Sequence, residues 1–166
     1  MLKKPEMRKK NKLVTDGAWM DETLREGQML CLALASPEGD PYALPMNYGY
    51  RDGVIYIHGA TAGFKKDIIA ANPRASFNVT LDVEIIRDPV PANFSCKFRS
   101  VTGFGEIEEI TDLSEKNRAL EILMRQFDGP HNDLDEESAK AVWVAKLVIS
   151  EMTGKVSGYP HPGETR

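Results

Sequence analysis

The sequence predicts a mainly β protein: a small barrel of six strands with peripheral helices, in one domain spanning residues 1–166. Three observations support this prediction. The length suits a single domain with its own core, short apolar runs are separated by turn signals, and only three stretches have helical spacing. A barrel is favoured because closing a sheet removes its exposed edges. An open α+β sheet is the alternative.

The expected elements follow one another in a simple order. They are a helix at 15–27, strands at 28–36, 42–50 and 54–58, a helix at 62–71, strands at 74–82 and 97–110, a helix at 112–127 and a strand at 142–152.

Local signals set the ends of the early elements. Thr15 or Asp16 can cap the first helix, and Gly27 stops it. The apolar run that follows reads as a strand. Asp52-Gly53, between two further apolar runs, is a strong signal for a hairpin. The sequence therefore predicts two strands joined by a two-residue turn.

The later elements have comparable signals. Gly103 and Gly105 indicate a bend or bulge within the long strand 97–110. Asp112 can cap the third helix, whose apolar residues recur at helical spacing. Residues 84–96 contain two prolines and no clear period, so we expect a long loop. An acidic loop is expected at 129–137.

The net charge of −4 divides unevenly along the chain. Residues 1–12 carry six basic groups and one acid, a net charge of +5, so the remainder carries −9. Such a basic arm can contact nucleic acid, stay in solvent or lie on an acidic neighbour. Because an acidic body binds a phosphate backbone poorly, we do not expect nucleic acid as a partner. Residues 156–166 are expected to form a loose tail.

The cysteines and the hydropathy constrain the location. Cys31 and Cys96 lack the spacing of a zinc site or a disulfide framework, which indicates a reducing cytoplasm. No apolar run approaches the ~18 residues of a membrane span. We therefore expect no association with a membrane. The three histidines lie far apart in the sequence, so we do not expect a metal site.

Alternation divides the side chains of the expected hairpin between two faces. The face expected in the core carries Met46, Tyr48, Tyr50, Ile55 and Ile57. The other carries Asn47, Gly49, Tyr56 and His58, with Asn47 opposite His58. This second face fits either a ligand wall, with a gap at the glycine, or a half-exposed hairpin with an ordinary Asn–His hydrogen bond.

The segment after His58 passes through small residues into a helix. Lys65 and Lys66 fall in the first turns of that helix, where its dipole disfavours cations. Free amides, small residues and two ammonium groups together predict a phosphate site. The alternative is a solvated pair of lysines. No P-loop or dinucleotide fingerprint is present, and no motif frames a hydrolytic nucleophile.

Four segments, in this order and spacing, resemble the pyridoxamine 5'-phosphate oxidase-like FMN-binding split barrels, and within them the nitroimidazole-resistance (Nim-type) branch. They are the P-x-N-Y-x-Y strand from Pro45, the IYIHGA-x-x-G-x-K turn ending at Lys65, the NPRASF strand start and the FRSV-x-G strand. The resemblance covers residues 7–155. It implies a six-stranded split barrel, usually a homodimer with two FMN sites at the interface.

The resemblance also implies roles for individual residues. Lys65 matches the phosphate lysine, with Lys66 assisting, and His58 matches the histidine beside the flavin where substrate enters. Arg99 and Ser100 match a strand that approaches the phosphate or the partner's site. The residues expected to line the flavin are Pro45, Met46, Asn47 and Tyr48 from one strand, and Tyr56, Ile57, His58 and Gly59 from the next.

Two departures from the family pattern narrow the function. Phe64 stands where the oxidases proper carry an arginine, and their C-terminal pattern for pyridoxal is missing, so vitamin B6 oxidation is not expected. The sequence therefore predicts a dimeric, FMN-dependent reductase of a small electron-poor acceptor such as a nitroaromatic. His58 would bind substrate or supply a proton near neutral pH. The alternative is a non-catalytic FMN- or haem-binding carrier or sensor.

Overall fold

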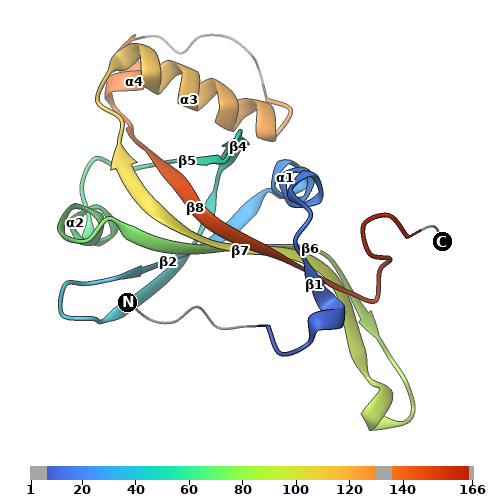
Figure 1. Ribbon diagram of the computed structural model, residues 1–166. Helices are drawn as coiled ribbons and strands as arrows, with labels where there is room; N and C mark the ends of the chain where they lie inside the picture. The colour runs from blue at the N-terminus through green and yellow to red at the C-terminus, as the bar shows by residue number, and fades with distance from the viewer. Residues whose placement is uncertain (1–6, 130–135, 165–166) are drawn as a thin grey trace.

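The computed structural model describes residues 7–129 and 136–164. An antiparallel sheet of eight strands curls around a buried interior, and helices lie at its ends and edges (Figure 1). The strand order is β3-β2-β6-β7-β8-β5-β4, and β1 pairs with β8. The prediction of a mainly β barrel is confirmed.

The strands are β1 (Leu13–Val14), β2 (Met29–Ala35), β3 (Pro41–Asn47), β4 (Gly49–Arg51), β5 (Val54–Gly59), β6 (Arg74–Ile86), β7 (Ser95–Glu109) and β8 (Trp143–Ser157). The helices are α1 (Gly17–Glu26), α2 (Phe64–Ala71), α3 (Leu113–Gln126) and α4 (Glu136–Lys140), with short 3-10 turns η1 (Lys10–Lys12) and η2 (Pro91–Asn93).

Side-chain caps begin two of the helices where the sequence predicts them. The Asp16 carboxylate accepts a hydrogen bond from the Trp19 amide at 2.8 Å, and Asp112 accepts one from the Glu115 amide at 2.8 Å. Each cap satisfies an amide that has no partner within its own helix. Gly27 follows the last residue of α1, as expected. None of the helices in the described ranges is long and apolar enough to cross a lipid bilayer.

The core has two parts that share β8. The barrel interior holds the inward residues of β2, β5, β6, β7 and β8, and all five hairpin residues predicted for the core are buried there. A second cluster lies beneath α3, where Leu120 and Leu123 pack near Ile110 and Val144. Burial on both sides of β8 makes this strand the structural centre of the molecule.

The strand predicted at 42–50 divides in two, which is a correction. β3 pairs with β2, placing Asn47 opposite Met29, while β4 pairs with β5. Tyr48 separates the two strands, and its buried hydroxyl donates a hydrogen bond to the Leu24 carbonyl at 2.6 Å. The ladder between β4 and β5 ends at Gly49 and Tyr56, so the predicted pairing of Asn47 with His58 does not form. On the other edge of β5, His58 lies opposite Val144 of β8.

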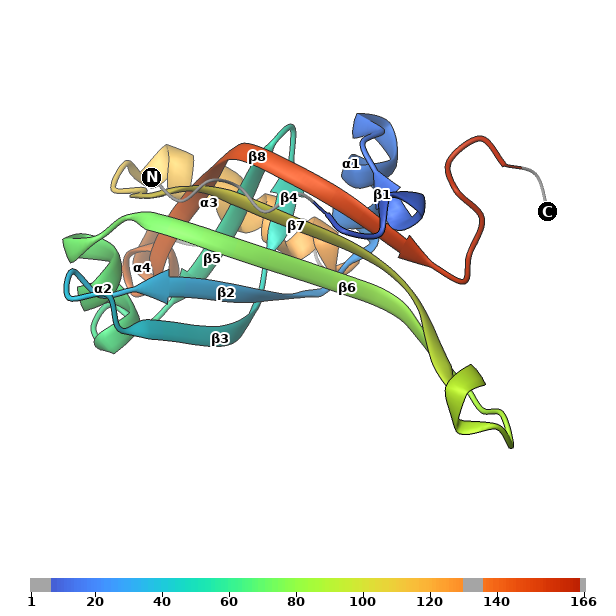
Figure 2. The ribbon, with the colours of Figure 1, turned by 60° about the horizontal axis from the view of Figure 1, so that its bottom comes forward.

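The loop predicted at 84–96 is wrong at both of its ends. β6 and β7 continue as a hairpin through Ile86 and Ser95, closed by η2. This extension, residues 82–96, projects from the body as a two-stranded arm (Figures 1 and 2). Both sides of the arm meet solvent, so its sequence carries no in–out alternation that would predict a strand.

The chain ends are held more firmly than expected. β8 extends to Ser157, so the loose tail does not begin at residue 156, and Val156 is 2% exposed. Within the N-terminal arm, the Lys12 ammonium donates a hydrogen bond to Ser157 Oγ at 2.6 Å. The described part of the acidic loop at 129–137 includes the start of α4. Residues 1–6 of the arm lie outside the described residues.

The expected bulge is present. The register of β7 with β8 shifts between Phe104 and Gly105, within the region that the two glycines predict. A Cβ at Gly105 would lie 2.2 Å from the Val148 carbonyl oxygen. Glycine is therefore required at 105 because the backbone of β8 passes too close for any side chain.

Candidate cofactor site

The end of β5 and the first turn of α2 bring Lys65 against the barrel wall. Its ammonium lies 3.7 Å from Met46 Sδ and 5.4 Å from the centroid of the Trp143 ring. None of the carboxylates in the described ranges forms an ion pair with it, and burial lowers the pKa of Lys65. A partly desolvated ammonium without a counter-ion is unfavourable unless an anion binds it.

Glycines make room for this ammonium. A Cβ at Gly59 would lie 2.6 Å from Lys65 Nζ, so the lysine occupies the space that any other residue would fill. Gly63, with a φ of +127°, precedes α2 in a conformation that side chains disfavour. It provides no side-chain cap to the first turn of α2, although its carbonyl accepts hydrogen bonds from the Lys66 and Asp67 amides.

A second unsatisfied donor lies in the same wall. Trp143 is 2% exposed, and its Nε1–H is buried without an acceptor in the described part of the chain. The ammonium above the ring, the glycine beside it and the helix terminus together fit a phosphate or similar anion at Lys65. They do not fit a cation.

His58 lies at the end of β5, on the face opposite to Gly59, because successive side chains alternate. Its ring is half-buried, and it has no hydrogen-bond partner among the residues that the structure describes. Burial, followed by the nearby charge of Lys65, lowers the pKa of His58 from 6.5. The ring is therefore neutral near pH 7, which disfavours the expected role as a proton donor in the absence of an anion.

We expect an NMR titration to place the midpoint of His58 below 6.5. Between these two pH values the unfolded chain binds more protons than the folded one. The free energy of unfolding should therefore fall as the pH decreases from about 6.5 to the lower midpoint of the folded protein. Adding phosphate should raise the midpoint by screening Lys65. Replacing Lys65 with Met should raise the midpoint of His58 only partly, because burial still lowers the pKa. A midpoint at or above 6.5 without phosphate would contradict the geometry.

Lys66 is occupied by another partner. Its ammonium forms an ion pair with Glu109 at 3.2 Å, on the side of α2 that meets the end of β7. The two lysines thus differ: Lys66 pairs with a carboxylate, and Lys65 does not pair with any in the described ranges. The assisting role of Lys66 remains a prediction.

The expected flavin-lining residues fall on both sides of the sheet. Pro45 and Asn47 are exposed on β3, whereas Met46 points inward and Tyr48 is fully buried. Alternation means that these four residues cannot form one continuous wall. Ile57 is likewise fully buried in the barrel.

The hairpin face interpreted as a ligand wall is partly covered by a helix. A Cβ at Gly49 would lie 2.7 Å from the Leu123 backbone nitrogen, so α3 occupies the gap at this glycine. Tyr56 packs against the cluster beneath α3. His58, farther along β5, is half-buried opposite Val144, which belongs to the same cluster. The sequence could not show this contact because α3 is more than sixty residues away in the chain.

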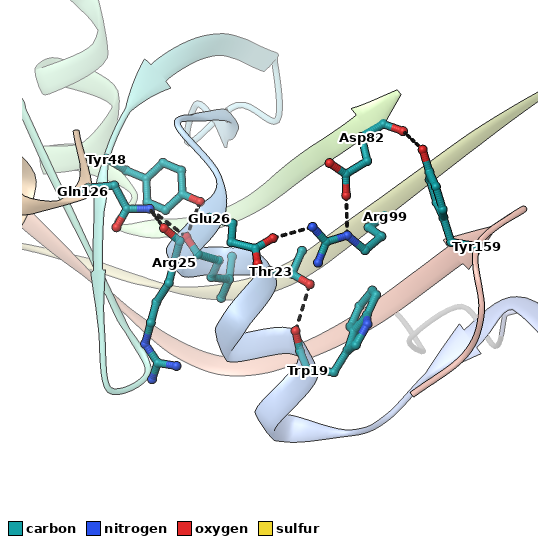
Figure 3. A network of polar contacts seen from close by, with 10 residues as sticks. Trp19, Thr23, Arg25, Glu26, Tyr48, Asp82, Arg99, Gln126 and Tyr159 are labelled. Carbon is teal, nitrogen blue, oxygen red and sulfur yellow. Dashed lines mark hydrogen bonds and ion pairs between the residues drawn. The ribbon is translucent and has the colours of Figure 1, made fainter. Parts of the chain in front are cut away.

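Arg99 lies in a separate network, which Figure 3 shows. Its guanidinium forms ion pairs with Glu26 and Asp82, and the Tyr159 hydroxyl donates to the Asp82 carbonyl at 3.0 Å. Partial burial disfavours the charge, but hydrogen bonds to both carboxylates raise the pKa of Arg99. A groove of about 560 Å³, lined by Arg99, Tyr159 and three neighbours, adjoins it. Ser100 is 6% exposed.

We expect Arg99→Met to reduce the free energy of unfolding by about 1–3 kcal/mol, because two carboxylates lose a shared cation. Flavin affinity should be unchanged if the network only supports the fold. Arg51→Met is the control, since its ion pair with Asp52 joins side chains that are 68% and 81% exposed. Urea unfolding of both variants measures the difference. A selective loss of FMN binding in Arg99→Met would restore the role implied by the resemblance.

The described residues contain no group of three or more His, Cys, Asp or Glu side chains that could hold a metal ion. Cys31 and Cys96 are free thiols, the first exposed on β2.

Comparison with protein families gives a match over most of the chain. The model of a family described as pyridoxamine 5'-phosphate oxidase matches residues 16–156. No curated protein matches the sequence.

Solved structures share the fold. A protein from Bacteroides thetaiotaomicron VPI-5482 assigned to 5-nitroimidazole antibiotic resistance is 26% identical, with a TM-score of 0.78 over 87% of this chain and 86% of that one. An FAD- and haem-binding protein from Mycobacterium smegmatis is 23% identical, with a TM-score of 0.79 over 90% and 75%. The flavocytochrome Anf3 from Azotobacter vinelandii is 20% identical, with a TM-score of 0.79 over 94% and 74%. These likenesses confirm the split-barrel fold.

Proposed function

The chain belongs to the pyridoxamine 5'-phosphate oxidase family, and from this premise we propose that it binds FMN and reduces small electron-poor acceptors such as nitroaromatics. The observation that carries the proposal is Lys65, a half-buried ammonium without a carboxylate partner at a glycine-rich helix start. A flavin phosphate is the group whose charge and size suit this position.

The similar structures support the flavin and the acceptor class. One of them is an FAD- and haem-binding protein, and another is assigned to resistance against a nitroimidazole antibiotic. When bound, a flavin supplies electron and hydride transfer, and the protein holds and orients it. Binding of the phosphate and contact with the acceptor are assigned to residues of this chain.

Two side chains have roles in this proposal. Lys65 would pair with the phosphate, which removes the cost of its own partial burial. His58, neutral and without a hydrogen-bond partner among the described residues, would donate one ring N–H to a polar atom of the acceptor. Neutralisation of Lys65 by phosphate would also raise the pKa of His58, which makes proton donation easier once the cofactor is bound.

The test is direct. Purified protein should show flavin absorbance or take up added FMN, and then reduce a nitroimidazole with a reduced nicotinamide cofactor. Failure to bind FMN would refute the proposal. Binding without turnover of any acceptor would favour the carrier or sensor, and a Soret band would indicate haem.

We expect His58→Ala to lower the reduction rate about tenfold to a hundredfold, with melting temperature and FMN affinity nearly unchanged. His161→Ala is the control, because His161 contacts the Asn11 carbonyl far from β5. A variant that is destabilised but turns over normally per flavin-loaded molecule would show that His58 only supports the hairpin.

A further inference from the structure

An exposed aromatic ring lies next to Lys65 at the start of α2. Phe64 is the first residue of this helix and is 63% exposed. Its ring meets that of Tyr42 edge to face, with 5.1 Å between the ring centroids and 75° between the ring planes. Tyr42 is partly buried against the barrel core, so it holds the Phe64 ring in place. Phe64 therefore offers an ordered aromatic face to solvent.

This aromatic pair lies along the same strand as the contact of Lys65. β3 begins beside α2 (Figure 2). Tyr42 and Met46 both point inward from β3, because side chains alternate, and Lys65 Nζ lies 3.7 Å from Met46 Sδ. Met46 is four positions beyond Tyr42, which is roughly 13 Å at ~3.3 Å per residue. The ammonium and the aromatic pair thus contact the two ends of one row of side chains.

Backbone donors are available at the same helix start. The Lys66 and Asp67 amides donate to the Gly63 carbonyl. The amides of Phe64 and Lys65 have no acceptor among the residues that the structure describes. Such amides at a helix N-terminus favour an anion. A pyrophosphate can use both sets of donors, with one phosphate at the ammonium and the other at the amides.

We infer that the Tyr42–Phe64 pair is a stacking site for the purine ring of a nucleoside diphosphate whose terminal phosphate lies at Lys65. The inference rests on the proposed function, which places a flavin phosphate at Lys65. A ribose and a pyrophosphate bridge a separation of the size found along β3, and a purine has a broad face to stack on an exposed aromatic ring. Either the ADP portion of FAD or free ADP supplies this chemistry.

The isoalloxazine ring of FMN is the competing occupant, since it is also flat and also linked to a phosphate. In the proposed function, however, this ring must reach the acceptor near His58, which lies on β5. The aromatic pair joins α2 to β3 instead. A flavin that extends from Lys65 toward β5 therefore leaves the pair open for a second ring.

Titration of the purified apoprotein with FMN, FAD and ADP tests the inference, by flavin fluorescence for the first two and by calorimetry for ADP. The wild type should bind FAD about fivefold to a hundredfold more tightly than FMN, the range expected for one stacked base. Phe64→Leu should remove most of that difference and leave FMN affinity nearly unchanged, whereas Phe64→Trp should retain it. Phe94→Leu is the matched control, because Phe94 is 55% exposed and lies on the arm, far from α2 (Figure 1).

Melting curves accompany each titration, because exposed substitutions should leave the fold intact. An effect of Phe64 on FAD identifies the dinucleotide as the source of the purine, and an effect on ADP alone identifies the free nucleotide. If Phe64→Leu changes FMN and FAD affinity alike, or if it changes neither and ADP does not bind, the inference is overturned and the proposed function stands. If neither flavin binds, the proposed function is refuted, and Phe64-dependent binding of ADP alone then decides the inference.

Discussion

Lys65→Met is expected to weaken FMN binding about tenfold to a hundredfold, and to leave riboflavin binding nearly unchanged. A charge-assisted hydrogen bond contributes roughly 1.5–3 kcal/mol, and riboflavin has no phosphate to receive it. Fluorescence titration of apoprotein with the two ligands measures the difference. Equal losses for both ligands would mean that Lys65 supports the fold and not the phosphate.

The same variant should be more stable than the wild type without ligand. Burial lowers the pKa of Lys65, so its charged form is disfavoured in the folded state. Below the folded pKa this cost is fully present, and it diminishes as pH rises through the folded pKa. Near neutral pH, methionine removes the cost. Lys65→Met should therefore raise the stability of the free protein and lower its affinity for FMN. A lysine that supported the fold would instead lower the stability when it is replaced.

Lys66→Met is the matched control. It lies next in the helix, carries the same group and is paired with Glu109. Its loss should cost little stability, because the pair is partly exposed, and should change FMN affinity less than the loss of Lys65. An equal or larger effect at Lys66 would reverse the assignment of the two lysines.

Gln126→Ala should reduce the free energy of unfolding by about 2–4 kcal/mol, the largest stability effect expected of any polar residue here. Its Nε2 lies 2.9 Å from the Leu24 carbonyl, 2.8 Å from that of Arg25 and 2.6 Å from that of Gly27. These are carbonyls at the end of α1, which lack partners within the helix. Its Oε1 accepts a hydrogen bond from the Tyr50 amide at 3.2 Å.

Gln126→Glu separates hydrogen bonding from packing. The shape is retained, but the ionised carboxylate has no N–H and faces several carbonyl oxygens, so we expect at least the loss seen with alanine. Acidification should reduce the difference, because a protonated carboxyl regains one donor. Arg125→Ala is the control, since its partner Glu121 lies on the same exposed helix surface. Unfolding in urea at two pH values gives the comparison.

Local signals predicted the elements well where one face of an element is buried. Asp16 and Asp112 cap their helices, and the five inward residues of the hairpin are all in the core. Such features depend on residues a few positions apart. The division of the strand at Tyr48 depends instead on a hydrogen bond to α1, twenty-four residues away.

The site was predicted unevenly for the same reason. Lys65 follows from a local motif, and the structure places it beside Gly59 without a carboxylate. Gly49 reads as a gap in a strand, whereas α3 fills that gap from a distant part of the chain. Of the two partners of Arg99, Asp82 lies at the irregularity of β6 and has a φ of +55°, whereas Glu26 comes from the end of α1. No local pattern carries that information.

The central place of β8 has a consequence for synthesis of the chain. This strand pairs with β1, β5 and β7, which precede it by very different distances in the sequence. It also follows all three of them in the chain, so it leaves the ribosome after them. Until β8 has been synthesised, β5 and β7 each have an unpaired edge. The barrel cannot close before then, because β8 is the strand that lies between them. Nascent chains that stall before residue 143 should therefore require chaperones, and premature stop codons there should yield aggregates and not shortened, working protein.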